Sequence, residues 1–415
     1  MQTVILGSGT AAKSAFTTLL ERVCPQEKVI LVTKEKDLFY SRVLLPDYIA
    51  GHISQQRLHL VPDEIPEDRA VIKRNTEAIG LEPERRLIHL SNKEKLVYDK
   101  LLIATGAAPT PWTDGNGLPE GVFYLRDLED AEQIRRRAAK VGECVVLGGG
   151  LVSLKAAWAL NQLGLTVKLL VSSSRLLSQI SDALISQWVY NLFSNHGVDI
   201  ELSAPATSFL TDAKGLRAVE LADGRRIPAQ LAVVGKGVRP NLGFAKGTSL
   251  RYDRGIIVDQ YMKTSVPDIY AAGDVAQVKD LLSGGNGMFT LWPEATVQGR
   301  IAANSILGFC EKAHTGALSM NSVVFYGVPF IMVGKVKEKD IQGLDVYKHV
   351  DLENKVYRKI VCANGRLVGA VFGGNVTYAG MVYWDIKSQR QINSPEDYLS
   401  LEGLSKVYHS RGSEL

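Results

Sequence analysis

Short apolar runs alternate with amphipathic stretches along the first three quarters of the chain. Thr3–Leu6 is an apolar run, residues 10–23 place their apolar side chains on one side of a helix, and Val29–Val32 is a second apolar run. A buried strand, a helix of period 3.6 and another buried strand make up a β-α-β unit. The pattern therefore predicts such a unit at the N-terminus.

The same order recurs in the middle of the chain. Cys144–Leu147 reads as a strand, residues 151–163 as a helix and Val167–Val171 as the next strand. A further apolar strand, Leu101–Ile103, ends at a glycine turn. Strands that alternate with helices indicate parallel, doubly wound sheets. We therefore expect two such sheets.

The pattern changes from about Ser319. Short segments such as Val323–Phe325, Ile331–Val333 and Lys355–Val361 suggest an antiparallel sheet. The predicted fold class is α/β, with two Rossmann-like nucleotide-binding domains and a C-terminal α+β domain. Residues 109–121 and 233–241 read as crossings between domains. The expected boundaries are 1–108 and 234–315 for a split first domain, 109–233 for an inserted second domain, and 316–415 for the third.

Composition and charge exclude several classes of protein. The chain has 415 residues, 22% of them charged, and a net charge of +4, which is too small to indicate nucleic-acid binding. Basic runs at Arg135–Arg137 and Lys335–Lys339 fit solvated faces or a docking patch for an acidic partner. No apolar run reaches the ~20 residues of a membrane span. The N-terminus begins directly with a strand, so no signal peptide is expected and the predicted location is cytoplasmic.

Cysteines and histidines show no metal-binding or disulfide spacing. Cys24, Cys144, Cys310 and Cys362 are widely separated, and we expect them to be buried structural thiols. The seven histidines form no ligand set or triad; they are His52, His59, His89, His196, His314, His349 and His409. We therefore predict no metal site.

Two glycine-rich loops carry the candidate chemistry. The first is Gly7-Ser8-Gly9-Thr10-Ala11-Ala12, between the first strand and its helix. Its first glycine allows the tight turn, its second lets a pyrophosphate approach the backbone, and Ala12 permits close helix packing. Glu35 follows the second strand, where an acid binds ribose hydroxyls. A dinucleotide site is expected here.

The identity of this dinucleotide comes from a resemblance. Residues 264–274 read as a strand that ends in Ala272-Gly273-Asp274. With the turn at Ala104-Thr105-Gly106 they resemble the pyridine nucleotide–disulfide oxidoreductases, which hold two dinucleotides. In that family the aspartate hydrogen-bonds the ribityl chain of FAD. The resemblance assigns FAD to the first loop.

Two further segments, residues 39–51 and 291–304, are similar to one branch of this superfamily. This branch includes rubredoxin reductases, NADH oxidases and large nitrite reductases. Segment 291–304 would place a helix N-terminus at the flavin. The resemblance is good over residues 1–310 and loose beyond them. It implies FAD contacts from Gly7, Gly9, Thr10, Ala11, Ala12, Glu35, Lys36, Ser41, Arg42, Ala104, Thr105, Gly106, Gly273, Asp274, Trp292, Ala295 and Gln298. Arg42 is also a candidate catalytic residue.

The second loop, Gly148-Gly149-Gly150, departs from the family pattern. By resemblance it binds NAD(H) or NADP(H), through Gly148, Gly150, Leu151, Val152, Ser172 and Gly237. The acid expected after Val171 is replaced by Ser172-Ser173-Ser174, which could accept either nucleotide. Lys155 stands where relatives carry a glutamate beside the nicotinamide. We expect Lys155 to be catalytic, by stabilising the charge of reduced flavin, or to pair with a nearby carboxylate.

The redox cysteine pair that disulfide reductases carry near Tyr40 is absent from the sequence. The predicted function is therefore hydride exchange between NAD(P)H and FAD, with single electrons passed to or from an iron–sulfur protein such as a rubredoxin or ferredoxin, or an iron–sulfur subunit of a larger oxidoreductase complex. Two alternatives stay open. One is an NADH oxidase or peroxide-reducing flavoenzyme. The other is an FAD electron-transfer subunit whose nucleotide site is degenerate.

Overall fold

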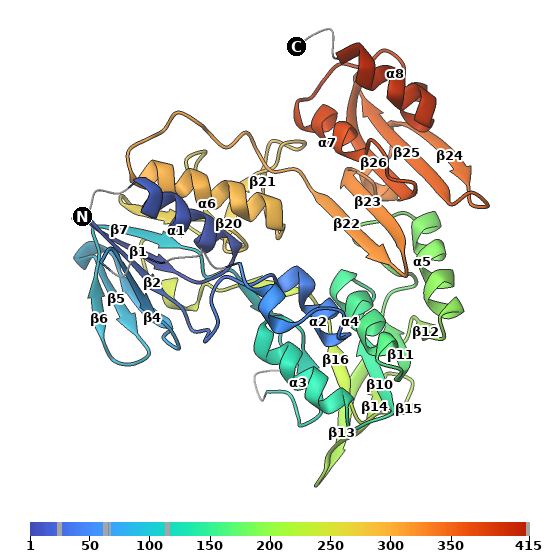
Figure 1. The fold of residues 1–415 in the computed structure, drawn as a ribbon, viewed down its shortest axis with the longest axis horizontal. Helices are drawn as coiled ribbons and strands as arrows, with labels where there is room; N and C mark the ends of the chain where they lie inside the picture. Colours follow the sequence, from blue (N-terminus) through green and yellow to red (C-terminus); the bar gives the residue numbers. More distant parts are fainter. Residues whose placement is uncertain (23–26, 61–64, 66–67, 113–116, 412–415) are drawn as a thin grey trace. The chain divides into compact units, whose positions relative to one another are not determined.

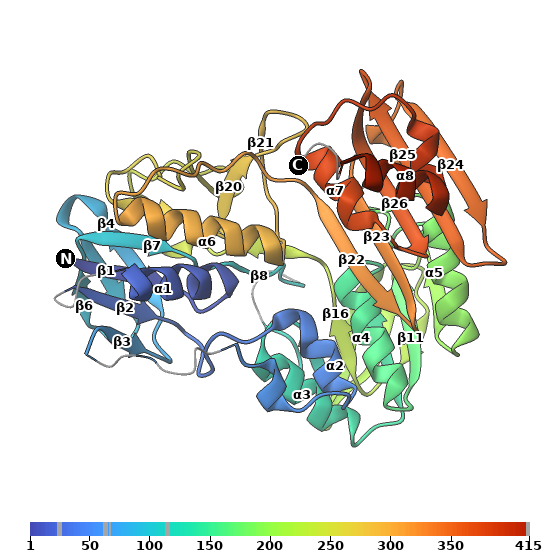
Figure 2. The ribbon, with the colours of Figure 1, turned by 45° about the horizontal axis from the view of Figure 1, so that its top comes forward.

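The computed structural model describes residues 1–22, 27–60, 65, 68–112 and 117–411. Their contacts divide the chain into two compact units (Figures 1 and 2). Unit 1 comprises residues 1–45, 53–110 and 238–317; unit 2 comprises 46–52, 111–237 and 318–415. The predicted fold class is confirmed, while the three-domain division with its boundaries remains a prediction.

Unit 1 is built on a parallel sheet of five strands in the order β19-β7-β1-β2-β3. The strands are β1 Gln2–Leu6, β2 Lys28–Val32, β3 Ala70–Lys73, β7 Lys100–Ile103 and β19 Ile269–Ala271. Outside the edge strand β3 their side chains are mostly buried, as the apolar runs predict for a sheet covered on both faces. The register pairs Leu6 with both Val32 and Ile103, so these strands end together at one edge.

Two helices of unit 1 lie side by side, α1 Thr10–Arg22 and α6 Trp292–Ile306 (Figures 1 and 2). Their contact is very close, because a Cβ added to Gly299 of α6 would lie 2.2 Å from the carbonyl oxygen of Ala11. Smaller sheets complete the unit. They are β4 Ala78–Glu82, β5 Leu87–Leu90 and β6 Lys95–Val97; β8 Ala107–Pro109 paired with β17 Val238–Pro240; and β20 Ala276–Lys279, which pairs with β18 Ile256–Ile257 and β21 Asn286–Gly287.

Unit 2 repeats the doubly wound pattern. Its parallel sheet has the order β12-β11-β10-β16-β9, and it is accompanied by three helices and an antiparallel hairpin. The strands are β9 Val122–Tyr124, β10 Glu143–Leu147, β11 Thr166–Val171, β12 Asp199–Leu202 and β16 Ala232–Val234. The helices are α3 Leu128–Ala138, α4 Leu151–Gln162 and α5 Ala183–Asn195; the hairpin is β13 Ala206–Asp212, β14 Gly215–Leu221 and β15 Arg226–Pro228.

The C-terminal part of unit 2 is the predicted antiparallel sheet, in the order β22-β23-β26-β25-β24. Its strands are β22 Met320–Phe325, β23 Val328–Gly334, β24 Asp345–Asp351, β25 Val356–Ala363 and β26 Arg366–Gly374, followed by α7 Ala379–Lys387 and α8 Leu401–Arg411. This sheet packs on α5, since Trp188 contacts Phe330 and Phe193 contacts Phe325 with ring centroids 5.3 and 5.1 Å apart. The aromatic contacts explain why residues 111–237 and 318–415 form one unit.

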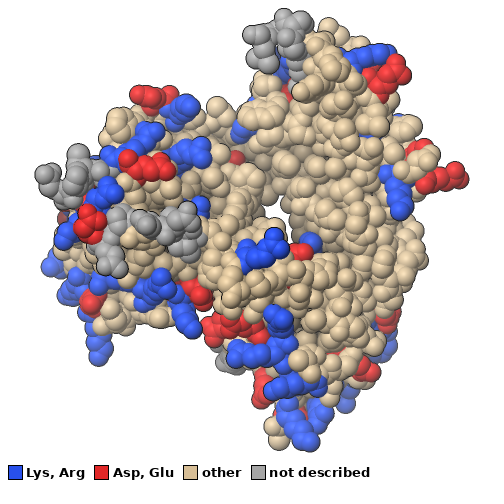
Figure 3. Space-filling model, in the orientation of Figure 1, with Lys and Arg blue, Asp and Glu red and all other residues tan. Residues whose placement is uncertain are grey.

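No described helix is long and apolar enough to span a membrane. Lys and Arg side chains gather on one face over the region of α3 and the β13–β15 hairpin (Figure 3). Arg135 and Arg136 of α3 are exposed there. This is the first of the two basic runs that the sequence singled out.

Candidate functional site

The first glycine loop meets the edge of the unit 1 sheet. Gly7 has φ +113°, and a Cβ at this position would lie 2.2 Å from the carbonyl oxygen of Ala104. Its N–H donates to Val32 O at 2.7 Å, while the Ala104 N–H donates to Leu6 O at 2.9 Å. The loop and the turn that begins at Ala104 are therefore held against each other by backbone contacts.

Gly9 differs from Gly7, because no protein atom lies within 4 Å of a Cβ built at this position. It immediately precedes α1, whose first backbone N–H groups and positive dipole end favour an anion. The loop thus combines a tight turn with an open approach to a helix N-terminus, which fits the pyrophosphate of a dinucleotide.

Glu35 follows β2 and is held by its neighbours. Tyr40 OH donates to Glu35 Oε2 at 2.5 Å, and the guanidinium of Arg42 forms an ion pair with Glu35 Oε1. Arg42 Nη1 also donates to the Tyr40 hydroxyl at 2.9 Å. These contacts fix the carboxylate that would bind ribose. They place Arg42 beside the predicted ribose-binding carboxylate, and its catalytic role remains a prediction.

The turn Ala104-Thr105-Gly106 is fastened to the crossing strand by Asn241. Asn241 Nδ2 donates to Thr105 O at 2.8 Å, and the Asn241 N–H donates to Gly106 O at 2.9 Å. Sequence reasoning named this segment but missed the residue that holds it.

Gly273 and Asp274 follow β19, which pairs in parallel with β7. Gly273 has φ +79° and packs on α1, because a Cβ there would lie 3.0 Å from the Cβ of Ala11. Asp274 is half-buried. Both ends of the Gln298 amide are used within the protein: its Oε1 accepts from Gly273 N at 2.8 Å and its Nε2 donates to Glu294 Oε1 at 3.2 Å.

The remaining predicted FAD residues also lie in unit 1. Ser41 and Ala295 are buried, Trp292 is half-buried at the start of α6, and Lys36 is exposed. Since β1, β2, β7 and β19 run parallel, the segments after their carboxyl ends meet at one sheet edge, where doubly wound folds bind ligands. The donor set, a glycine cradle with the carboxylates Glu35 and Asp274, fits FAD.

The second loop reproduces the first in unit 2. Gly148 has φ +112°, its Cβ would lie 2.4 Å from the carbonyl oxygen of Gly235, and its N–H donates to Leu170 O at 2.8 Å. Gly150 has open space around a Cβ, as Gly9 does. Ser153 Oγ donates to Leu147 O at 3.1 Å, so the third small residue serves the turn itself. The loop geometry is intact.

The segment after β11 contains hydroxyl groups where an acid was expected. Ser172 is exposed, and the Leu177 N–H donates to Gly149 O at 2.8 Å, which docks residues 172–177 against the glycine loop. Ser173 Oγ donates to Arg175 O at 2.9 Å. The nearest following carboxylate, Asp182, is buried and binds Lys359. Residues 172–181 therefore contain no carboxylate, and Arg175 is their only charged residue.

Lys155 lies one turn into α4, with its Nζ 4.5 Å from the ring centroid of Trp158. Burial lowers the pKa of Lys155, and the charge of Asp47 opposes this shift. Val152 and Gly237 of the predicted nucleotide site are in the same unit; Val152 is exposed, and Gly237 has φ +83°. Beside Gly237, burial lowers the pKa of Lys236, whose Nζ lies 3.7 Å from the Trp112 ring centroid.

The cysteines offer no redox partner among the described residues. Cys144 and Cys362 are buried as predicted, and burial raises their pKa to about 12 and about 11. The prediction is wrong for Cys310, which is exposed in the segment that follows α6. Cys24 lies outside the described residues. No group of three or more His, Cys, Asp or Glu in the described parts is placed to hold a metal ion.

Two parallel sheets with one glycine loop each define a flavoprotein fold that holds two dinucleotides. Comparison with known proteins agrees: residues 1–299 match the family described as pyridine nucleotide-disulphide oxidoreductase, and residues 320–390 match the rubredoxin NAD+ reductase C-terminal domain. The chain belongs to the pyridine nucleotide-disulphide oxidoreductase family. It is accordingly an oxidoreductase that uses FAD and NAD(P)H. The C-terminal match is firmer than the loose resemblance expected from the sequence.

Similar proteins include subunit epsilon of NADH-dependent phenylglyoxylate dehydrogenase from Aromatoleum evansii, 31% identical over 94% of this chain and 92% of that protein. Rubredoxin-NAD(+) reductase from Pseudomonas putida is 29% identical over 76% of this chain and 82% of its own length. The nitrite reductase of Bacillus subtilis is 26% identical, and the chain spans about half (49%) of it. A solved putidaredoxin reductase, in covalent complex with putidaredoxin, superposes with a TM-score of 0.88 at 26% identity, over 99% of this chain and 98% of the other.

Proposed function

We propose that this protein exchanges hydride between NAD(P)H and FAD and exchanges single electrons with an iron–sulfur protein, or with an iron–sulfur subunit of a complex to which it belongs. The observation that carries the proposal is the repetition of one loop geometry at the edges of two parallel sheets, at Gly7 and at Gly148. The cytoplasmic location predicted from the sequence is part of the proposal.

In this proposal each unit has one binding task. Gly9 and the N-terminus of α1 hold the FAD pyrophosphate, Glu35 binds the ribose while Tyr40 and Arg42 orient it, and Asp274 binds the ribityl chain. Gly150 and the N-terminus of α4 hold the nicotinamide nucleotide. FAD, when bound, supplies both two-electron and one-electron chemistry. Arg42 then acts as a positioning residue.

Lys155 is the proposed catalytic residue of unit 2. Burial lowers the pKa of Lys155, and the same partial exclusion of water strengthens its interaction with negative charge in its vicinity. The sequence also left open that Lys155 pairs with a nearby carboxylate, and Asp47 is a carboxylate whose charge acts on Lys155. We propose that Lys155 stabilises charge during hydride exchange, with Asp47 holding it in place.

The choice of electron partner is supported by the relatives. Their names include a rubredoxin reductase, a putidaredoxin reductase and a dehydrogenase subunit. Two of these names contain the redox protein that the reductase serves, rubredoxin and putidaredoxin. The described cysteines provide no thiol relay. Electrons would therefore leave the flavin without passing through a disulfide.

Stopped-flow mixing of the FAD-loaded protein with NADH and with NADPH tests the hydride half of the proposal. We expect the flavin absorbance to bleach on a catalytic timescale, and to return when an oxidised rubredoxin or ferredoxin is added under anaerobic conditions. Gly150→Ala should slow the bleaching, with Gly142→Ala as control, because a Cβ at either glycine meets no protein atom within 4 Å and neither glycine has a positive φ.

Two other outcomes identify the alternatives. Failure of both nucleotides to bleach the flavin, with retention of FAD, indicates an electron-transfer subunit with a degenerate nucleotide site; the missing acid after β11 is the observation that favours it. Lys155→Glu would then show whether the site can be restored. Rapid oxygen consumption with NADH alone indicates an NADH oxidase.

A further inference from the structure

A chain of buried polar side chains joins the FAD-binding turn to the segment that follows α6. Gly273 N donates to Gln298 Oε1, and Gln298 Nε2 donates to Glu294 Oε1, as described above. His314 Nε2 binds the same Glu294 oxygen, and the Gly316 N–H donates to His314 Nδ1 at 3.3 Å. The side chains of Glu294 and His314 are only 8% and 3% exposed, and Gln298 is 1% exposed. Their burial makes this an internal network.

The hydrogen bonds determine where the protons lie. Gly273 N can only donate, so the Gln298 oxygen faces it and the Gln298 NH2 faces Glu294. Gly316 N also can only donate, so His314 Nδ1 carries no proton and its Nε2–H points at Glu294. In this arrangement His314 donates through Nε2, so two donors converge on one carboxylate oxygen of Glu294. Hydrogen bonds of this kind favour the ionised form of a carboxyl group.

The position of Glu294 in α6 favours the same charge state. It lies in the first turn of this 15-residue helix, where the macrodipole stabilises an anion. Its neighbour Ala295 contacts Gly273, since a Cβ on that glycine would lie 3.8 Å from the Cβ of Ala295. A buried negative charge thus lies two hydrogen bonds from the turn that presents Asp274.

We propose that Glu294 lowers the reduction potential of the bound FAD, and that His314 is the positioning residue that keeps its carboxylate ionised. The inference rests on the proposed FAD site at Gly7, Gly9 and Gly273. Electrons that enter a flavin add negative charge, and a fixed carboxylate in a low-dielectric interior opposes that addition. A lower potential would make the flavin a stronger reductant toward iron–sulfur acceptors. Neither residue was singled out from the sequence, because they lie 20 positions apart in no recognisable motif.

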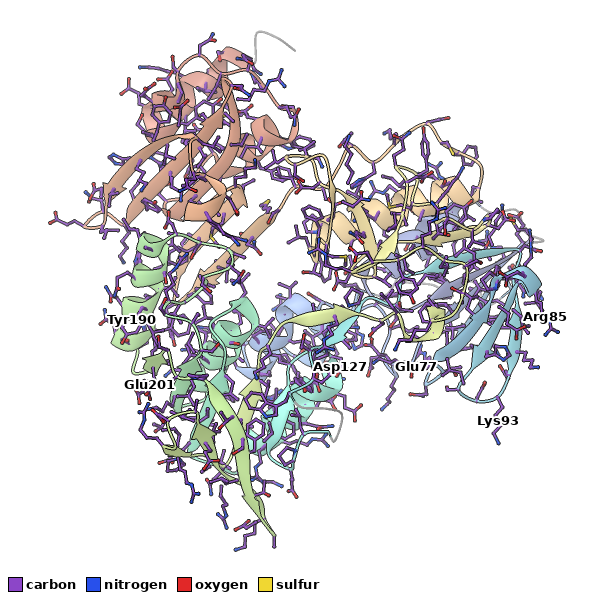
Figure 4. All side chains as sticks on the ribbon, turned by 180° about the vertical axis from the view of Figure 1, so that it is seen from behind. Glu77, Arg85, Lys93, Asp127, Tyr190 and Glu201 are labelled. Atoms are coloured by element: carbon purple, nitrogen blue, oxygen red, sulfur yellow. The ribbon has the colours of Figure 1, made fainter. Side chains whose placement is uncertain are left out.

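The test is the midpoint potential of the FAD-loaded protein, measured by spectroelectrochemistry. Glu294→Gln removes the charge and keeps the size of the side chain, and we expect the potential to rise. Glu77→Gln is the matched control in unit 1, because Glu77 is an exposed carboxylate (labelled in Figure 4), and it should leave the potential unchanged. An unaltered potential in Glu294→Gln, with FAD content and melting temperature retained, would overturn the proposal.

Variants at His314 separate electrostatic tuning from a structural contact. His314→Leu removes the donor, so the potential should rise toward that of Glu294→Gln, and the double variant should rise no further. His314→Gln retains a donor and should restore the original value. If Glu294→Gln does not hold FAD, the midpoint potentials of His314→Leu and His314→Gln are compared instead. Equal potentials of these two variants would refute the proposal. Failure of the FAD site itself is seen separately, as unchanged FAD affinity in Gly9→Ala.

Discussion

Two glycines of the first loop differ in what a methyl group would meet. Gly7→Ala would force a Cβ to 2.2 Å from Ala104 O at φ +113°, whereas Gly9→Ala meets no protein atom. We expect Gly7→Ala to lower the stability of unit 1 by about 1–3 kcal/mol, as strained backbone does. Gly9→Ala should fold normally and bind FAD at least about tenfold more weakly, a loss of about 1.4 kcal/mol.

Thermal unfolding and FAD titration of the apoprotein measure these two effects separately. Gly285, which has no positive φ and where a Cβ would meet only Ser283 Oγ at 3.8 Å, provides the control variant Gly285→Ala. Equal FAD affinities of Gly9→Ala and the original protein would contradict the assignment of this loop.

We expect Ser172 to decide how the second site treats a 2′-phosphate. No carboxylate follows β11 within the described segment 172–181, so nothing there repels NADPH. Ser172→Asp would place a negative charge at the end of β11, and we expect it to weaken NADPH binding relative to NADH by about tenfold or more, since like charges discriminate by repulsion. Fluorescence titration with both nucleotides measures the ratio, and Gln179→Asp, also exposed, controls for a general effect of added charge. An unchanged ratio would argue against ribose binding at Ser172.

At the residue scale, the sequence predicted the groups whose spacing is local. Gly7, Gly9 and Glu35 belong to one β-α-β unit, so their roles could be inferred from distance along the chain. Glu294 and His314 could not be found in this way, because they meet only when the segment after α6 folds back. Ser153 was noted as a small residue, but its hydrogen bond to Leu147 O depends on the three-dimensional turn.

At the scale of elements, α3 provides a prediction about pH. Asp127 (labelled in Figure 4) and Asp130 form its capping box, in which Asp130 Oδ2 accepts from the N–H groups of Arg126 and Asp127. Burial, with the charge of Asp127 adding to it, raises the pKa of Asp130 to about 6. The folded state therefore binds this proton more tightly than the unfolded chain does.

It follows that Asp130 favours folding most below its unfolded pKa, and that this contribution is lost as pH rises through about 6. Asp130→Asn keeps an acceptor oxygen and cannot ionise. As pH rises from 4 to 7, the free energy of unfolding of the variant should increase by on the order of 2–3 kcal/mol relative to that of the original protein. Urea unfolding at several pH values measures the difference. Parallel pH profiles of the two proteins would show that Asp130 ionises normally.

Most elements could be predicted because their periodic apolar patterns extend over many residues. The expected helices at 10–23 and 151–163 are α1 and α4, within one residue at the described ends. The segment 264–274 was expected to be one strand, but only Ile269–Ala271 forms β19. Pro267 cannot donate to a sheet ladder, and Asp268 adopts φ +65°, so the strand begins after them.

At the scale of the whole molecule, the contacts place residues 111–237 and 318–415 in one compact unit, while the division into three domains stays a prediction. The side chains that join these two parts are not revealed by any periodicity. Asp182 caps α5 through the Ile185 N–H at 3.1 Å, and it also receives Lys359 Nζ at 2.6 Å and Tyr357 OH at 2.7 Å from β25 of the C-terminal sheet. One carboxylate thus binds the nucleotide-binding part to the C-terminal part of unit 2.

Lys359 is 1% exposed, and its only other described acceptor is Val336 O at 2.7 Å. Burial alone would raise the pKa of Asp182, but the hydrogen bond and the charge of Lys359 outweigh this effect. The net result is a lowered pKa, which favours the ionised carboxylate. Lys359→Met would leave this charge buried without its cation, which typically costs about 3–5 kcal/mol. Asp182→Asn keeps the cap of α5, so the double variant Asp182→Asn with Lys359→Met should be more stable than Lys359→Met alone.

Scanning calorimetry of the full-length, FAD-loaded protein measures this coupling. We expect Lys359→Met to lower the melting temperature of the transition that includes the C-terminal sheet, and the double variant to recover part of the loss. Because the pKa of Asp182 is lowered by folding, its contribution is present at neutral pH and is lost as pH falls through that lowered value. The difference in melting temperature between Lys359→Met and the original protein should therefore become smaller at acid pH. A difference that is independent of pH, or a double variant no more stable than Lys359→Met, would mean that packing rather than this ion pair holds the two parts together.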